Sequence, residues 1–478
     1  MTAGQRTGTA RWWALVWISV TQLMMVVDGT VMNIAVPSAQ AELGLSDVQR
    51  QWVITVYVLA FGSLLLLGGR ISDVIGRRKA LLIGLAGFAL ASIVGGMSGS
   101  AEVLIAARAV QGVSGALVTP SALALLSVSF PDGADRVKAF GVFGTIMGSG
   151  SGIGVLLGGA LTDSWGWRWA LLINVPIAIA AGIGLMSSVT SDPRGSGRID
   201  VIGGILSAVG LTALTLGLTV AESYGWGSLV TIGLLALGAL LIGGFVLRQR
   251  AATQPLVPLS LFGERLRSAA FAAMFAWGIA VLPAFLFLSV YLQQIVGLSP
   301  LLTGLGFLPY TAAILITVRL VRPALRLGLP PRVFLTIGLL LLAGGLLMLT
   351  LLEPDSSYWS RVLPVFVLLG LGTGCVQPAS NSAATHRAGA ASGAAGAVAS
   401  TSQQIGSSLG MALLGTIAAT GTAAVLADPT SPASQHAATL TGYHAASLTG
   451  AVILAVAALA VFALAGRTTP TTRKDTTA

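Results

Sequence analysis

The sequence predicts an all-α polytopic membrane protein. Only 9% of its 478 residues are charged, 55% are hydrophobic and the mean hydropathy is +0.88, whereas about a quarter of the residues in a soluble domain are charged. Apolar runs long enough to cross about 30 Å of hydrocarbon recur along the whole chain. The basic residues, which give a net charge of +10, lie in small groups between these runs. We therefore expect them to orient the protein in a lipid bilayer and not to bind nucleic acid.

Fourteen apolar runs are long enough to span the membrane as helices. They lie at residues 12–36, 49–69, 80–98, 102–125, 139–161, 168–189, 200–221, 228–247, 268–293, 301–321, 333–352, 360–384, 393–420 and 445–465. With the N-terminus inside, nearly all of the 26 Lys and Arg residues fall on the inner side, and the outer side holds only Arg50, Arg168 and Arg361. This asymmetry predicts a multi-pass protein of the cell (plasma) membrane with both termini in the cytoplasm.

Asp28 is the acidic residue that lies deepest within a predicted span. An ionised carboxylate in hydrocarbon is costly unless it is paired or reaches a water-filled cavity, so acids at this depth usually belong to an ion or substrate pathway. Arg108 lies about six residues from the outer end of its span, and Asp28 about eight residues from the outer end of its own. At about 1.5 Å per residue the two depths differ by only a few ångström. The spacing therefore allows a side-chain pair.

The loop between the second and third runs contains glycines that allow a tight turn and charges that stand at helix ends. They are Gly69, Asp73, Gly76, Arg77 and Arg78. Their order resembles the loop 2–3 signature of the major facilitator superfamily. The stretch from Leu104 to Gly115, which includes Arg108, resembles the span-4 motif of the same family.

Other motifs resemble the fourteen-span drug:proton antiporter subgroup of that family over nearly the whole chain. They are the stretch Asp28–Asn33, Trp167–Trp169 followed by Asn174–Pro176, and Tyr291–Gln294 followed by Gly297–Pro300. The fifth run resembles the glycine-rich antiporter motif through Gly141, Gly150, Gly154, Gly158 and Gly159, although Val155 stands where the family has proline. Glycines four residues apart let another helix approach closely.

The resemblance implies the major facilitator fold, with two six-helix bundles plus two extra central helices. The chain would then divide into an N-terminal six-helix bundle (1–190), two inserted transmembrane helices (191–250), a cytoplasmic interfacial linker (251–267), a C-terminal six-helix bundle (268–466) and a disordered cytoplasmic tail (467–478). We also expect residues 421–443, which are rich in Ala, Thr, Ser and Pro, to form an irregular outer loop.

The resemblance also implies roles for particular residues. Asp28 and Arg108 would couple protons, and Arg136, where the family places a partner for the loop aspartate, would complete a conformational gate with the loop 2–3 residues. The five glycines would form a flexible helix stripe. A central substrate cavity would collect polar and aromatic side chains, namely Gln22, Asn33, Gln111, Tyr291, Gln294, Tyr310, Gln377 and Asn381.

Together these features predict a proton-coupled efflux transporter that exports lipophilic drugs or antibiotic-like compounds by alternating access. The last six predicted spans contain no acid, which favours neutral, zwitterionic or monocationic substrates. A dedicated exporter of one endogenous metabolite and an uncoupled facilitator are the alternatives. A membrane enzyme would need a nucleophile, a metal cluster or paired acids in the bilayer, and the predicted spans show no such constellation. We expect a monomer without cofactor or metal, whose partners are lipid, protons and a small lipophilic substrate.

Overall fold

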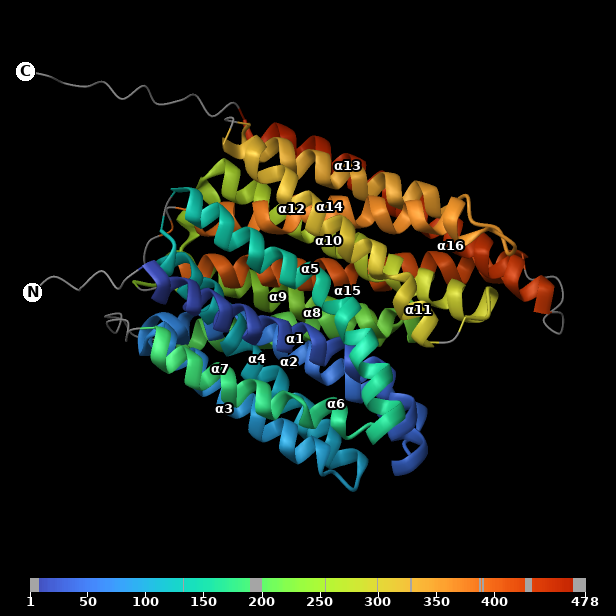
Figure 1. Cartoon of the computed structure of the whole chain (residues 1–478), viewed down its shortest axis with the longest axis horizontal. Helices are drawn as coiled ribbons and strands as arrows, with labels where there is room; N and C mark the ends of the chain where they lie inside the picture. Colours follow the sequence, from blue (N-terminus) through green and yellow to red (C-terminus); the bar gives the residue numbers. More distant parts are fainter. Residues whose placement is uncertain are drawn as a thin grey trace, which may run out of the picture.

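The computed structural model describes residues 8–131, 133–189, 200–253, 255–298, 300–326, 329–386, 388, 391–425 and 432–466. The regular elements within these ranges are all helical. Figure 1 shows them as two groups of long, roughly parallel helices, with α1 beginning and α16 ending at the same end of the molecule.

The N-terminal half is built from the first seven helices. They are α1 (Gly8–Leu43), α2 (Asp47–Ile75), α3 (Arg77–Gly96), α4 (Ala101–Ser129), α5 (Gly133–Trp165), α6 (Trp169–Leu172) and α7 (Asn174–Ser188). Ser46 starts α2 with a capping box, in which its hydroxyl accepts from the Gln49 N–H and its own N–H donates to the Gln49 side chain. Gly76 separates α2 from α3 with a φ of 94°, a conformation that favours glycine.

The C-terminal half contains the helices from α10 onward. They are α10 (Arg265–Val290) with a π-helical turn at Tyr291–Ile295, α11 (Pro300–Gly306), α12 (Leu308–Arg326), α13 (Pro331–Leu349), α14 (Leu363–Thr385) after a π-helical turn at Tyr358–Val362, α15 (Ser392–Val425) and α16 (Pro432–Ala465). A large apolar core joins α10, α12, α13, α14 and α16. The two halves thus have separate cores.

The inserted pair, α8 (Val201–Tyr224) and α9 (Leu229–Ala251), packs as a hairpin. Helix α8 contacts α2 of the N-terminal half and α15 of the C-terminal half. Asp200 holds the start of the hairpin, because its carboxylate accepts from the Gly203 N–H at 3.0 Å and from the Arg248 guanidinium at 3.3 Å. The pair therefore lies across the boundary between the halves.

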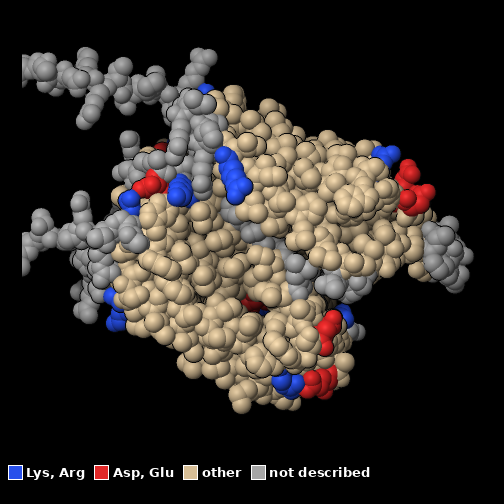
Figure 2. Space-filling view, viewed as in Figure 1, with Lys and Arg blue, Asp and Glu red and all other residues tan. Residues whose placement is uncertain are grey.

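Thirteen helices among the described residues are long and apolar enough to cross a membrane. Helix α5, which matches the predicted span at 139–161, is a further helix of 33 residues. On the face drawn in Figure 2, most charged side chains gather at the two ends of the molecule, and few are visible in the broad area between them. These findings confirm the expected all-α multi-pass architecture.

One expectation about the connecting segments is wrong. The predicted irregular loop at 421–443 is largely helical, because α15 continues to Val425 and α16 begins at Pro432. The two helices stay packed there, with Gly421 against Gly442, and Thr439 and Thr441 donate their hydroxyls to carbonyls one turn back. Alanine favours helix more strongly than any other residue, so the composition that suggested a loop also extends helices.

The placement of the linker at 251–267 on the inner membrane surface stays a prediction. Within the linker, Leu256, Val257 and Leu261 are each at most 4% exposed. They pack in a cluster with Phe271 of α10 and with alanines of α14 and α15. Burial against the protein removes them from both lipid and water, so the linker forms part of the packed structure. The predicted tail at 467–478 lies outside the described residues.

Candidate functional site

Asp28 lies at the centre of a buried polar network in the N-terminal half. Its Oδ2 accepts a hydrogen bond from Arg108 Nη1 at 2.7 Å, and its Oδ1 accepts one from Asn174 Nδ2 at 2.7 Å and one from Gln111 Nε2 at 3.2 Å. Asp28 is 1% exposed and Arg108 2%. The depths read from the sequence therefore do bring these two side chains into contact.

Arg108 is held on several sides. Its Nη1 also donates to Gln111 Oε1 at 2.8 Å, its Nε donates to the Val53 carbonyl at 3.3 Å, and its guanidinium carbon lies 4.2 Å from the centre of the Tyr57 ring. Ring faces attract cations. Helices α1, α2, α4 and α7 thus converge on a single ion pair.

In each described hydrogen bond of the Asp28 carboxylate, the neighbouring side chain donates and the carboxylate accepts. An ionised carboxylate can only accept. The arrangement is therefore suited to the ionised form, whose burial would be strongly unfavourable without such partners. Losing Arg108 would remove the cation and leave two neutral amide donors. The hydrogen bonds to Asp28 thus depend on whether helices α1, α4 and α7 keep this packing.

Sequence reasoning missed Asn174 as a partner of Asp28 and placed Gln111 among cavity residues. Gln111 is fully buried and bridges Asp28, Arg108 and Ser92. Asn174 begins α7 directly after the break that follows α6, where its side chain meets α1. An amide at the start of a half-helix inside a predicted span is the signal that could have found it.

The glycines of α5 pack against the opposite side of α1. A Cβ on Gly150 would lie 2.8 Å from Val26, one on Gly154 would overlap Thr30, and one on Gly158 would lie 3.0 Å from the Cα of Val31. The structure therefore brings three of the five stripe glycines against the helix that carries Asp28. Gly159 has open space on its Cβ side, and Gly141 faces a pocket instead.

The predicted gate residues lie where α2 meets the start of α15. A Cβ on Gly69 would lie 3.0 Å from the Gly393 carbonyl, and a Cβ on Gly393 would lie 2.7 Å from Asp73 Oδ1. The Asp73 carboxylate thus stands at the N-terminus of α15, where the helix dipole favours negative charge. Arg77 Nε lies 3.5 Å from the same carboxylate, and Arg78 donates to the Met186 carbonyl of α7 at 2.8 Å.

Arg136 joins the two halves at the same end of the molecule. Its Nη2 donates to Thr385 Oγ1 of α14 at 2.9 Å, and its Nη1 donates to the Phe130 carbonyl at 3.1 Å. The predicted contact between Asp73 and Arg136 is not among these bonds and stays a prediction. Together with the packing of α2 on α15, the bonds of Arg136 close the end that carries the loop 2–3 motif.

The remaining predicted cavity residues are spread over the molecule. Tyr291 donates its hydroxyl to the Glu353 carbonyl at 2.8 Å, Gln294 is exposed, and Tyr310 donates to Thr373 Oγ1 at 3.2 Å. Gln22, Gln377 and Asn381 are buried, and the side-chain oxygens of the two glutamines find no hydrogen-bond partner among the described residues. The side chain of Asn33 is not among those described. None of these residues lines the pockets that the structure describes, so the cavity stays a prediction.

A cluster at the opposite end fastens α1 to the break before α7. Glu42 accepts from Trp167 Nε1 at 2.8 Å and pairs with Arg168, which also donates to the Ser98 carbonyl at 3.2 Å. The hydrogen bond from Arg168, helped by the one from Trp167, holds the pKa of Glu42 below its usual value. We call Glu42, Trp167, Arg168 and Ser98 the Glu42 clamp.

Comparisons with known proteins agree with this architecture. The family model of the Major Facilitator Superfamily matches residues 18–411. A puromycin resistance protein of Streptomyces alboniger is 44% identical over 438 residues, which cover 91% of this chain and 87% of that protein. A cephamycin export protein of Amycolatopsis lactamdurans is 36% identical, with 93% and 92% of the two chains covered. A tetracenomycin C resistance and export protein of Streptomyces glaucescens is 35% identical, with 87% and 78% covered.

The crystal structure of the human organic anion transporter MFSD10 has a similar fold. It superposes with a TM-score of 0.66 at 16% identity, covering 95% of this chain and 99% of that one. At this identity the likeness concerns the fold alone.

Proposed function

This chain belongs to the major facilitator superfamily, and from that premise we propose that it exports antibiotic-like, amphipathic small molecules in exchange for protons. Membership makes it a membrane transporter and not an enzyme. Relatives that cover most of the chain are named for resistance to antibiotics or for their export. Proton coupling and substrate class are the parts that we add.

The observation that carries the proton-coupling proposal is the buried network of Asp28. A carboxylate that is 1% exposed and bonded to Arg108 on one oxygen is stable as an anion only while that packing lasts. In our proposal, rearrangement of the N-terminal half weakens the Arg108 contact and opens Asp28 to water, where it takes up a proton. When the Arg108 contact forms again, Asp28 releases the proton. Occupancy of the proton site is thereby linked to conformation.

The glycine stripe of α5 supports the same mechanism. Gly150, Gly154 and Gly158 let α5 lie against α1 with little side-chain interlocking, so α5 can slide along the helix that carries Asp28. In the proposed cycle the closed end formed by α2, α15 and Arg136 opens while the opposite end closes. The energy available is adequate, since one pH unit supplies about 1.4 kcal/mol and 100 mV supplies about 2.3 kcal/mol per charge.

The test is export in everted membrane vesicles with puromycin as the probe. Wild-type protein should accumulate puromycin against its gradient, a protonophore should abolish the accumulation, and added puromycin should release protons from the vesicle lumen. Asp28→Asn should lose both uphill accumulation and proton release. Asp163→Asn removes an exposed acid at the far end of α5 and should behave as wild type.

Uphill accumulation that survives in Asp28→Asn would refute the assignment of Asp28. Accumulation that never exceeds the equilibrium level in wild-type protein would favour an uncoupled facilitator.

A second candidate function is the export of one compound only. The individual antibiotics in the names of the relatives favour it. Growth of sensitive cells that overproduce the protein, on a panel of chemically unrelated antibiotics, separates the two. Protection against a single chemical class would establish the narrow function.

A further inference from the structure

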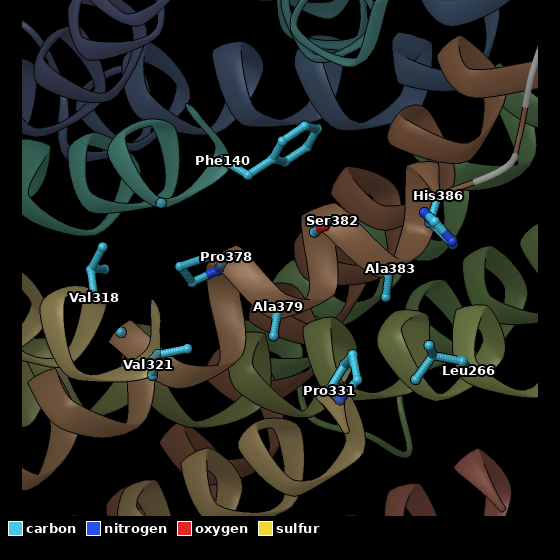
Figure 3. A pocket seen from close by; sticks show the side chains of 12 residues that line it. Phe140, Leu266, Val318, Val321, Pro331, Pro378, Ala379, Ser382, Ala383 and His386 are labelled. Atoms are coloured by element: carbon cyan, nitrogen blue, oxygen red, sulfur yellow. The ribbon is translucent and has the colours of Figure 1, made fainter. Parts of the chain in front are cut away.

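A pocket of about 330 Å³ lies between the two halves at the closed end. Phe140 and Gly141 of α5 line one side, and α12 and α14 contribute Val318, Val321, Ala379 and Ala383. Figure 3 shows Phe140 on one side of the space facing the α14 residues Pro378 and Ser382, with Val321 and Pro331 on the far side. Leu266 and Pro331 at the starts of α10 and α13, with Gly374 of α14 and His386 at its end, complete the wall.

The side chains of the pocket wall indicate the chemical class of the ligand that fits. Most of the wall is aliphatic or aromatic, and no lining residue carries a carboxylate. Its polar side chains are the Ser382 hydroxyl, which makes no hydrogen bond with the described residues, and the His386 imidazole (Figure 3). The volume is in the range of small-molecule sites and is too small for a helix or a protein segment. A neutral lipophilic molecule with one or two hydrogen-bonding groups fits these features.

Two contacts between the halves frame the pocket. On its inner side, Gly144 of α5 packs against Pro378, so closely that a Cβ on the glycine would lie 2.7 Å from the proline ring. On the side of the pocket nearest the closed end of the molecule, Arg136 donates to Thr385. The guanidinium carbon of Arg136 lies 4.5 Å from the centre of the Phe140 ring. The packing of Gly144 on Pro378 separates the pocket from the deeper part of the interface. The pocket is thus distinct from the Asp28 network.

We propose that this pocket binds a small, neutral, lipophilic molecule that bridges α5 and α12–α14, and that the bound molecule holds the motif-bearing end closed and so inhibits export. The inhibition rests on the proposed export function, whereas the binding does not. A ligand that contacts both halves in one conformation only stabilises that conformation by its differential affinity. If the closed end opens, α5 leaves α14 and the site is divided, so binding and opening exclude each other.

Binding is tested with a thiol placed in the wall. Ser382→Cys is made in a Cys375→Ala background, which removes the chain's single cysteine, and the full-length protein is reconstituted in phosphatidylcholine nanodiscs. Alkylation by N-ethylmaleimide is timed with and without the neutral dye Nile red. At a free dye concentration near ten times its dissociation constant, the reaction should be about tenfold slower.

Two matched variants control this measurement. Ser260→Cys places a thiol at an exposed position of the linker, where Nile red should leave the rate unchanged. Adding Ala383→Leu to Ser382→Cys fills the pocket with a larger side chain and should abolish protection. Nile red that fails to slow Ser382→Cys, or that slows Ser260→Cys equally, overturns the proposal. A Ser382→Cys thiol that is slow in nanodiscs without dye but fast in delipidated detergent assigns the pocket to a lipid chain and also overturns it.

The functional arm uses puromycin export in everted vesicles. Nile red should lower the wild-type rate and leave Ala383→Leu unaffected, provided that this variant exports at the wild-type rate without dye. If Ala383→Leu does not export, Val321→Phe, which fills the pocket from α12, takes its place. Equal inhibition of wild-type protein and the filled variant overturns the inhibitory role. Protection of the thiol without any puromycin export in wild-type protein would instead refute the proposed function and leave the binding site standing.

Discussion

The absence of a side chain at Gly154 allows α5 to approach α1 closely. An ideal Cβ at this position would lie 1.7 Å from Thr30 Oγ1, about 1.7 Å short of the 3.4 Å at which ordinary contact begins. In Gly154→Ala, therefore, either the Thr30 hydroxyl swings away from the Val26 and Val27 carbonyls that it bonds at 3.2 and 3.0 Å, or α1 and α5 move apart.

Such overpacking costs about 1–3 kcal/mol, and Ala in place of Gly within a helix returns about 1 kcal/mol. We expect Gly154→Ala to lose up to about 2 kcal/mol of unfolding free energy on balance. Export should slow about tenfold, which corresponds to about 1.4 kcal/mol in the barrier, because a displaced α1 carries Asp28 away from Arg108. Gly159→Ala is the matched control, since nothing lies within 4 Å of its Cβ.

The assay compares the thermal unfolding midpoint in dodecyl maltoside and the initial rate of puromycin export for both variants. Thr30→Ala in the Gly154→Ala background removes the clashing oxygen, after which the nearest remaining atoms lie at 3.0 and 3.2 Å. This double variant should recover most of the lost stability and rate. Equal behaviour of Gly154→Ala and Gly159→Ala, or no recovery in the double variant, would refute the close-approach argument.

Two further predictions concern the buried pair and the Glu42 clamp. Arg108→Ala leaves the Asp28 carboxylate buried without its cation and should lower the unfolding free energy by about 3–5 kcal/mol, while adding Asp28→Ala should restore stability. Denaturant unfolding in mixed micelles measures both variants. A double variant no more stable than the single one would contradict the pairing. The Arg168 bond lowers the pKa of Glu42 from its usual 4.5, so the clamp stabilises the fold above that pH and is lost as the pH falls through the folded-state pKa. Glu42→Gln should remove this acid dependence of the melting midpoint, and an unchanged profile would refute it.

The sequence predicted those parts of the protein that depend on depth and periodicity. The apolar runs located the membrane helices, and the distance of Asp28 and Arg108 from their span ends anticipated a contact that lies at 2.7 Å. Membrane depth can be counted along a chain, because a helix rises by a fixed amount per residue. The glycine spacing on α5 likewise predicted close helix contact, which the packing of Gly150, Gly154 and Gly158 on α1 confirms.

The parts that sequence reasoning missed depend on which helix faces which. Asn174 bonds Asp28 only because α7 lies beside α1, and no periodic pattern encodes that neighbour. The pocket at the closed end draws on α5, α10, α12, α13 and α14, so no single stretch of sequence marks it. The prediction for residues 421–443 was wrong because the end of α15 and the start of α16 are rich in alanine. Small residues suit both exposed turns and tightly packed helices.

Helix α8 makes the inserted hairpin more than an addition to a twelve-helix transporter. It covers the seam where α2 meets α15, where Leu67 of α2 packs against Gly204 and Trp226 donates to Thr416 of α15 at 3.0 Å. In the proposed cycle, any movement of one bundle against the other would therefore have to carry a helix that contacts both. Excising residues 200–251 to obtain a minimal transporter would remove the side chains that cover the alanines of α15. It would leave an exposed apolar surface at the boundary between the two halves.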